Sequence, residues 1–297
     1  MLSRFPHLIA AFVLGSGLLA VPPGVAAVAV RDDAGFEVRL AQPARRIVSL
    51  APHTTELLYE IGAGDRVVGA EPYSDYPDAA RRIPRVGGLS GIDVEAIVAL
   101  RPDLVIAWLS GTSKAQIEQL VRLGIPVFRS EPHTFDDVTE TLARFGILTG
   151  RVDAAQADAA RFRTRLDALR DAYSHRAPVR VFYQVWNKPL MTVGGPQLIT
   201  QAIALCGGRN VFDTLQALAP TVDPEAVIAS DPQLIVTAST RSEHAADLAQ
   251  WERWSGVSAV RARRYLFLDP ALISRHTSRI LVGTETLCRA IDDARTH

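Results

Sequence analysis

One fifteen-residue segment occurs twice in this chain, and this repeat constrains the fold more than any other feature. Residues 93–107 read DVEAIVALRPDLVIA and residues 223–237 read DPEAVIASDPQLIVT, with six identical positions. Each copy is predicted to form a short helix and then a buried strand. Asp is a good N-cap, Pro cannot continue the helix, and the apolar run after it suits a strand covered on both faces. The repeat therefore predicts two similar lobes, each built around its own sheet.

The repeat also places one glutamate two residues after each capping Asp, at Glu95 and Glu225. One interpretation is local, because the helix dipole favours an anion in the first turn. The other is functional: two matched lobes would present two matched carboxylates to one partner with two-fold symmetry. The pattern alone leaves both interpretations open.

The remaining pattern predicts an α/β chain of two lobes with mostly parallel sheets and helices on both faces. Residues 152–174 contain no Gly or Pro, and apolar residues recur there at helical spacing. We therefore predict one long, rigid helix that joins the lobes. The predicted organisation is a signal peptide at 1–27, an N-terminal α/β lobe at 46–150, the linking helix at 151–176 and a C-terminal α/β lobe at 177–295.

The N-terminal residues have the features of a secretory signal. Arg4 precedes an apolar run from Leu8 to Val21, and small residues follow at Ala26 and Ala27. The run is short for a membrane span, so we expect cleavage near Ala27 and export to the periplasm. Basic and acidic residues balance, 32 against 32, which gives no sign of a nucleic-acid partner.

Export gives the two cysteines a predicted role. Cys206 and Cys288 are the only cysteines in the chain. In an oxidising compartment such a pair is expected to form a disulfide, the alternative being two separate buried thiols. No Cys/His cluster has the spacing of a zinc site, so no metal site is expected.

Polar and aromatic side chains follow the ends of several predicted strands. Ligands of open α/β sheets bind outside the carboxyl ends of the strands. Two such lobes would form a cleft walled by aromatics, which suits a flat or bulky ligand with polar edges. The alternative for each aromatic is core packing. The residues are His53, Tyr73, Tyr76, Trp108, His133, Trp186, Arg275 and His276.

Motifs that would indicate an enzyme are missing from the sequence. There is no G-x-S-x-G elbow and no P-loop, and Gly87, Gly88 and Gly91 do not make a dinucleotide fingerprint. A secreted enzyme would need a nucleophile and base in the cleft, and the sequence offers none. A sensory module is a further alternative, but no output domain is expected after residue 297.

The chain resembles the periplasmic cobalamin-binding proteins of ABC importers, within the helical-backbone, class III substrate-binding proteins. The resemblance covers about residues 45–293 and implies two Rossmann-like lobes, a rigid linking helix and cobalamin bound between the lobes. It implies a receptor that is not an enzyme and has no cofactor, since cobalamin is the transported ligand. The stretches that carry it are YSDYP (73–77), IVALRPDLVIAW (97–108), LGIPV (123–127), LCGGRNVF (205–212) and VDPEAVI (222–228).

The resemblance also implies roles for individual residues. Cys206 and Cys288 match the family's disulfide, and Glu95 and Glu225 match carboxylates that bind arginines on the permease dimer. The receptor is expected to be a monomer that contacts the membrane only through this permease. The expected ligand-binding residues are Tyr73, Ser74, Asp75, Tyr76, Trp108, Trp186, Ala271, Leu272, Ile273, Ser274 and Arg275.

Three positions depart from the family pattern. Leu89, Ala219 and Val185 stand where better-known members have cleft aromatics. Cobalamin or a related corrinoid is still the expected ligand despite these losses. A corrinoid without its lower base would need fewer side chains to wall the cleft. The alternative is a haem or siderophore receptor of the same class. Haem would need an iron ligand, for which His53, His133, His276 or a cleft Tyr are the candidates.

Overall fold

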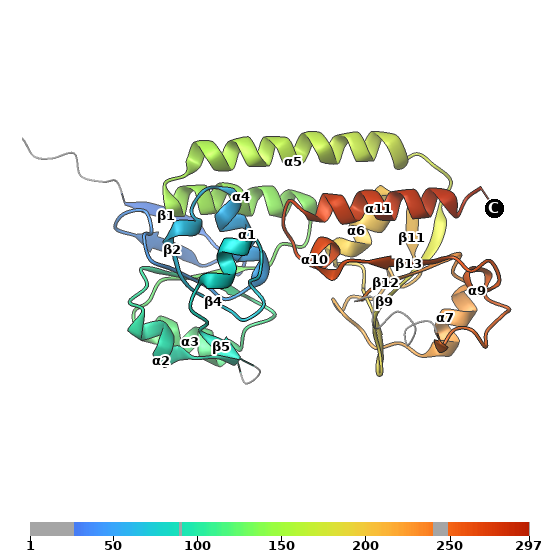
Figure 1. The fold of residues 1–297 in the computed structure, drawn as a ribbon, viewed down its shortest axis with the longest axis horizontal. Coiled ribbons are helices and arrows are strands. Elements are labelled where there is room, and N and C mark those ends of the chain that lie inside the picture. Colours follow the sequence, from blue (N-terminus) through green and yellow to red (C-terminus); the bar gives the residue numbers. More distant parts are fainter. Residues whose placement is uncertain (1–26, 89–90, 240–248, 297) are drawn as a thin grey trace, which may run out of the picture.

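The computed structural model describes residues 27–88, 91–239 and 249–296, which form two lobes side by side (Figure 1). All but the last residue of the predicted signal peptide lies outside these residues. Most of the segment 242–254, which the sequence predicts to be a helix, also lies outside them. Within them, no helix is both long enough and apolar enough to cross a membrane.

The N-terminal lobe contains a four-stranded parallel sheet in the order β4-β3-β7-β8. Its strands are β3 (Ile47–Ser49), β4 (Val67–Ala70), β7 (Leu104–Trp108) and β8 (Val127–Ser130). Its helices are α1 (Pro52–Glu60), α2 (Val94–Ala99), α3 (Lys114–Arg122) and α4 (Phe135–Thr149). Two small antiparallel pairs join β1 (Val28–Arg31) to β2 (Glu37–Leu40) and β5 (Gly87–Gly88) to β6 (Gly91–Ile92).

The C-terminal lobe contains a five-stranded sheet in which β10 is the antiparallel member. Its strands are β9 (Val179–Asn187), β10 (Leu190–Thr192), β11 (Gly208–Asn210), β12 (Leu234–Ala238) and β13 (Tyr265–Leu268). Its helices are α6 (Leu198–Leu205), α7 (Pro224–Ser230), α9 (Ser258–Arg261), α10 (Pro270–Ile273) and α11 (Ile280–Asp293).

Both sheets are covered on both faces, as the unbroken apolar runs predict. In β7, Leu104 and Ile106 pack on the side of α1 and α4, whereas Val105 and Ala107 pack against α2 and α3. The fold class predicted from the sequence, two α/β lobes with mostly parallel sheets, is therefore confirmed.

The long helix α5 (Val152–Tyr173) runs along both lobes on one side of the molecule (Figure 1). Its 22 residues span about 33 Å at the helical rise. Buried Phe162, Leu166 and Leu169 belong to a single apolar cluster that also contains core residues of both lobes. This shared core stiffens the connection. The predicted residue bounds of the signal peptide, lobes and linking segment stay predictions.

The two copies of the repeat adopt the same local structure. Arg101 and Asp231 occupy matching positions after α2 and α7, and both have a positive φ, of 47° and 43°. Each precedes a proline, which disfavours the right-handed helical conformation. Asp93 caps α2 through a hydrogen bond from the Ala96 N–H, but Asp223 makes no side-chain cap bond at α7. The chain therefore leaves α2 and α7 through the same backbone conformation in both lobes.

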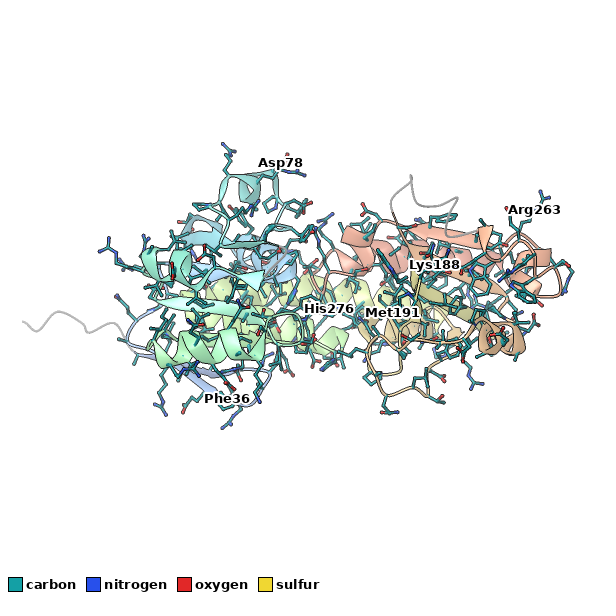
Figure 2. The ribbon with its side chains drawn as sticks, turned by 90° about the horizontal axis from the view of Figure 1, so that it is seen from below. Phe36, Asp78, Lys188, Met191, Arg263 and His276 are labelled. Atoms are coloured by element: carbon teal, nitrogen blue, oxygen red, sulfur yellow. A yellow bond between two sulfur atoms is a disulfide. The ribbon has the colours of Figure 1, made fainter. Side chains whose placement is uncertain are left out.

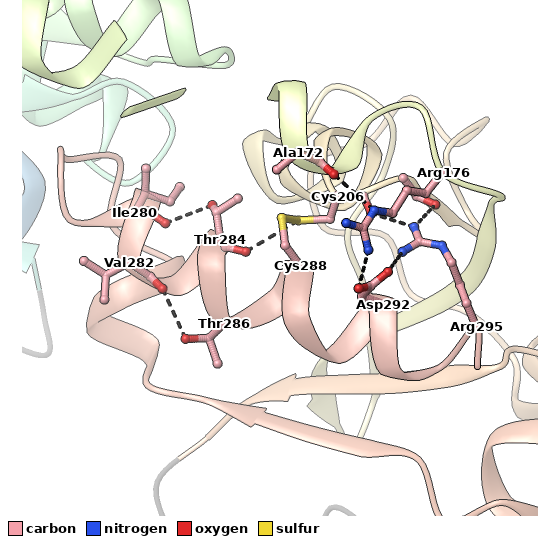
Figure 3. The surroundings of a disulfide bond; sticks show 11 residues. Ala172, Arg176, Cys206, Ile280, Val282, Thr284, Thr286, Cys288, Asp292 and Arg295 are labelled. Carbon is pink, nitrogen blue, oxygen red and sulfur yellow. Dashed lines mark hydrogen bonds and ion pairs between the residues drawn. A yellow bond between two sulfur atoms is a disulfide. The ribbon is translucent and has the colours of Figure 1, made fainter. Parts of the chain in front are cut away.

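The predicted disulfide between Cys206 and Cys288 is present, and it links the end of α6 to α11 (Figure 3). Arg295 lies beside it and donates to the Cys206 carbonyl at 2.8 Å. The bond closes a loop with a sequence separation of 82. In the chain-entropy model such a loop stabilises the fold by roughly 4–5 kcal/mol.

Candidate functional site

A cavity of about 390 Å³ lies between the lobes and is lined by residues of both. Its N-lobe wall includes residues at or just after the carboxyl ends of β7 and β8: Trp108, Ser110, Glu131 and His133. Its C-lobe wall includes Tyr183, Val185, Ala219, Ala238, Ser274 and His276. The cavity therefore lies where ligands of open α/β sheets bind.

Trp108 is the last residue of β7 and is held in place by its neighbours. Its indole N–H donates to Glu131 Oε1 at 3.2 Å, and the Ser110 backbone N–H donates to Glu131 Oε2 at 2.7 Å. The His53 ring meets the indole edge to face, with centroids 5.9 Å apart. Trp108 is still 36% exposed. It thus offers a preorganised aromatic surface to the cavity.

Two histidines lie buried near the same wall. His276 lines the cavity and lies between the lobes (Figure 2), with its ring centroid 6.0 Å from that of His53. Burial lowers the pKa of His276 to about 4, although Glu131 opposes this shift. Burial and the proximity of His276 lower the pKa of His53 to about 3. Both imidazoles are therefore neutral at neutral pH.

Only two of the predicted ligand-binding residues line this cavity. Trp108 and Ser274 line it, whereas Tyr73, Ser74, Asp75, Tyr76, Trp186, Ala271, Leu272, Ile273 and Arg275 are not among its lining residues. Ile273 is fully buried in the core, and buried Ser74 hydrogen-bonds to Thr55 at 2.8 Å. Tyr73, Tyr76 and Trp186 are exposed aromatics.

Of the three positions that depart from the family pattern, Val185 and Ala219 line the cavity. Leu89 lies outside the described residues. His133, a candidate iron ligand, also lines the cavity and is exposed. No group of three or more His, Cys, Asp or Glu side chains in the described part of the chain could hold a metal ion.

Arg275 connects the two lobes. It donates through Nη1 to Glu56 and to Asp75, both at 2.7 Å, and through Nη2 to the Tyr73 carbonyl at 3.3 Å. Burial raises the pKa of Asp75, but its bond to Arg275 outweighs this, so the net shift is downward.

Arg279 and Thr277 extend this contact. Arg279 also pairs with Glu56, and its guanidinium carbon lies 3.7 Å from the centroid of the Tyr76 ring. Thr277 donates to Glu56 at 3.2 Å. Glu56 is not among the residues predicted from the sequence, although a carboxylate next to the apolar residues of α1 is a signal that it needs partners.

Glu95 and Glu225 are exposed in the first turns of α2 and α7. Both helices lie on the side of the molecule away from α5, one at each lobe (Figure 1). Neither carboxylate forms an ion pair or side-chain hydrogen bond with any residue that the structure describes. Both are therefore available for contacts with another molecule.

The fold and this inter-lobe cavity define a two-lobed ligand-binding protein. The chain belongs to the periplasmic binding protein family, whose pattern matches residues 47–272. This membership confirms the prediction of a binding protein that is not an enzyme. It also agrees with the expectation that the bound molecule is a transported ligand and not a cofactor.

Individual relatives agree with this assignment. The chain is 36% identical over 249 residues to a vitamin B12-binding protein of Yersinia pestis, covering 84% of this chain and 87% of that protein. It is similar in structure to the periplasmic vitamin B12 binding protein BtuF of Vibrio cholerae, with a TM-score of 0.79 and 33% identity over 86% of this chain and 99% of that one. A periplasmic heme-binding protein of Pseudomonas aeruginosa gives a TM-score of 0.75 and 25% identity, over 84% and 92% of the two chains.

Proposed function

We propose that this protein is a periplasmic receptor that binds cobalamin or a related corrinoid between its lobes and delivers it to an ABC permease. The observation that carries the proposal is the cavity at the strand ends of both lobes, walled by Trp108 and by apolar side chains. A flat macrocycle with polar edges matches such walls. The names of the relatives from Yersinia pestis and Vibrio cholerae support the choice of ligand.

The predicted contact residues outside the cavity lining belong to the rim in this proposal. Trp186 follows the lining residue Val185, and Arg275 lies between Ser274 and His276, which both line the cavity. Tyr73 joins this rim because its carbonyl accepts from Arg275. A ligand larger than the cavity would meet these side chains at its edges. Ser74 and Asp75 act through Arg275 and the surrounding loop.

Glu95 and Glu225 are the docking residues in this proposal. Each is exposed and unpaired within the described chain, and each belongs to one copy of the repeat. Two such carboxylates suit a permease dimer that carries one basic group on each half. The receptor reaches this partner as a monomer after export, with its signal peptide removed near Ala27.

The test is a calorimetric titration of the chain from residue 28 onward with cyanocobalamin, dicyanocobinamide and haem. We expect one-to-one binding of a corrinoid tighter than micromolar, and the two corrinoids compared will show whether the lower base contributes. Tight binding of haem without corrinoid binding would overturn the proposed ligand.

A haem receptor is the second candidate, and one observation favours it. His276 presents a neutral imidazole to the cavity, and imidazole is a common axial ligand of iron. The structural relative from Pseudomonas aeruginosa is named for haem binding. The same titration distinguishes the two candidates.

A further inference from the structure

The wall of the inter-lobe cavity, as far as the structure describes it, carries one acidic side chain and no Lys or Arg. The acidic residue is Glu131. Its carboxylate is fixed at this wall, because Oε1 accepts from the Trp108 indole N–H and Oε2 accepts from the Ser110 backbone N–H, and both donors belong to lining residues. Glu131 is 7% exposed and forms no ion pair with any residue of the described chain. The wall is therefore negative and lacks a counter-ion.

The basic side chains beside the cavity do not balance this charge. Arg275 bonds to Glu56 and to Asp75, both at 2.7 Å, and Arg279 also pairs with Glu56. In this cluster two guanidinium groups face two carboxylates, so its charges cancel. His133 lines the cavity but is exposed, so solvent screens any charge on its ring. A ligand in the cavity thus meets the negative charge of Glu131 without a free cation beside it.

The charge of Glu131 acts across the cavity. His276 belongs to the wall of the other lobe, where burial lowers its pKa to about 4 and the charge of Glu131 opposes this shift. Charges in a wall shielded from water interact over longer distances than charges in solvent, because the local dielectric constant is lower. An anionic group of a ligand in this cavity would therefore be repelled by Glu131 without touching it.

This distribution of charge separates two classes of planar macrocycle. Corrinoids end their edge groups in carboxamides, which are uncharged and carry N–H donors that a carboxylate attracts. Porphyrins such as haem carry two carboxylates at one edge, and carboxylates favour a site that offers a cation. A like charge in a binding site gives specificity chiefly by rejecting the wrong partner.

We infer that Glu131 makes the inter-lobe site selective for macrocycles with uncharged amide edges, by repelling those with carboxylate edges. The inference rests on the proposed function, in which the ligand is a corrinoid. It gives Glu131 a role beyond holding the Trp108 ring, since the charge of the carboxylate determines which edge chemistry the cavity accepts.

The experiment compares two corrinoids that share one ring and differ in their edges. Dicyanocobinamide ends its edge groups in amides. Dicyanocobyrinic acid has a carboxylate at each of these positions, so an anionic edge faces Glu131 in every orientation. Calorimetry gives the ratio of the two dissociation constants. We expect the wild type to favour the cobinamide by at least about 100-fold, and Glu131→Gln to reduce this ratio by about 10-fold.

Two further variants separate charge from structure. Glu131→Asp keeps the negative charge and should keep the ratio, although its shorter side chain loosens the hold on Trp108 and weakens binding of both corrinoids. Glu118→Gln removes an exposed carboxylate of α3, outside the cavity lining, and should behave as the wild type. Circular dichroism checks that the variants fold. An unchanged ratio in Glu131→Gln, or an equal fall in Glu131→Asp, would overturn the inference.

Failure of this inference is distinguishable from failure of the proposed function. If the wild type binds both corrinoids equally tightly, the selectivity is refuted without any variant, and the corrinoid receptor stands. Absence of cobinamide binding by the wild type would overturn both, since no ring with amide edges would then be selected. Haemin, with its two carboxylates, should bind more weakly than the cobinamide, and tighter binding of haemin would contradict the role of Glu131.

Discussion

Arg275 Nη1 lies 2.7 Å from Glu56 Oε1, although the two residues are separated by 219 positions in the chain. Glu56 belongs to α1 of the N-terminal lobe, and Arg275 follows α10 of the C-terminal lobe. The side chain of Glu56 is 3% exposed, and that of Arg275 is 16% exposed. This buried pair, with the shared core along α5, connects the two lobes beside the cavity.

Replacement of Arg275 should destabilise the protein because it removes a partner from a buried carboxylate. Arg279 and Thr277 remain near Glu56, so we expect Arg275→Ala to lower the free energy of unfolding by about 2 kcal/mol. Urea unfolding measures this change. Arg289→Ala is the matched control, because its pair with Glu285 is exposed and should contribute under about 1 kcal/mol. Equal stability of the two variants would show that the buried pair with Glu56 contributes no more to the free energy of unfolding than an exposed pair does.

Loss of the aromatic wall should weaken ligand binding. Trp108→Ala removes the surface that Glu131 and His53 hold in position, and we expect about 10- to 100-fold weaker corrinoid affinity by calorimetry. Trp108→Phe should recover part of this loss. Phe36→Ala replaces an exposed aromatic on the β1–β2 connection and should leave affinity unchanged. An unaltered affinity in Trp108→Ala would mean that the ligand lies elsewhere.

Charge reversal at the two repeat carboxylates should separate binding from transport. The double variant Glu95→Arg and Glu225→Arg should lose corrinoid uptake by more than about 10-fold, since like charges would face each other at the permease. Its corrinoid affinity should equal that of the wild type. Glu140→Arg is the control, because Glu140 is exposed on α4, which lies on the α5 side of the molecule (Figure 1). Wild-type uptake by the double variant would rule out the docking role.

Stability should fall in mild acid because of the two buried histidines. Their pKa values in the folded protein are about 3 for His53 and about 4 for His276, against an ordinary 6.5. Between pH 6.5 and these values the unfolded chain binds more protons than the native one. Lowering the pH therefore favours unfolding, by about 2 kcal/mol for each imidazole at pH 5.

Urea unfolding at pH 7.5 and pH 5 of the wild type and of His53→Asn plus His276→Asn measures this effect. The double variant should lose less stability than the wild type over this interval, and His175→Asn, at an exposed position, should behave as the wild type. The same acid sensitivity in all three proteins would assign it to other groups.

Local patterns in the sequence predicted much of this fold. The repeat predicted two lobes, because Asp caps, prolines and apolar runs act within a few residues of one another. The strand ends predicted that Trp108, His133 and His276 would converge on a cleft, which the structure places along one cavity. The disulfide followed from the presence of two cysteines in an exported chain.

Contacts between distant segments could not be predicted in this way. The pair of Glu56 and Arg275 depends on how the two lobes pack, and no local spacing encodes it. The same packing turns Arg275 toward carboxylates of the N-terminal lobe and buries Ile273, although both lie in a stretch expected to contact ligand. The sequence of residues 28–45 predicts only an extended lead-in to the first lobe. In the structure, residues 28–40 form the antiparallel β1–β2 pair, because residues such as Val38 and Leu40 pack into the core.

Because the backbone has matching conformations at Arg101 and Asp231, the two copies of the repeat are equivalent in local structure. This equivalence affects the orientations in which the receptor can dock on a two-fold partner. In the docking proposal, rotating the receptor by half a turn about the partner's axis would exchange Glu95 and Glu225. Both orientations would then allow docking, so about twice as many encounters would lead to a complex. Either lobe could dock on either half of the permease.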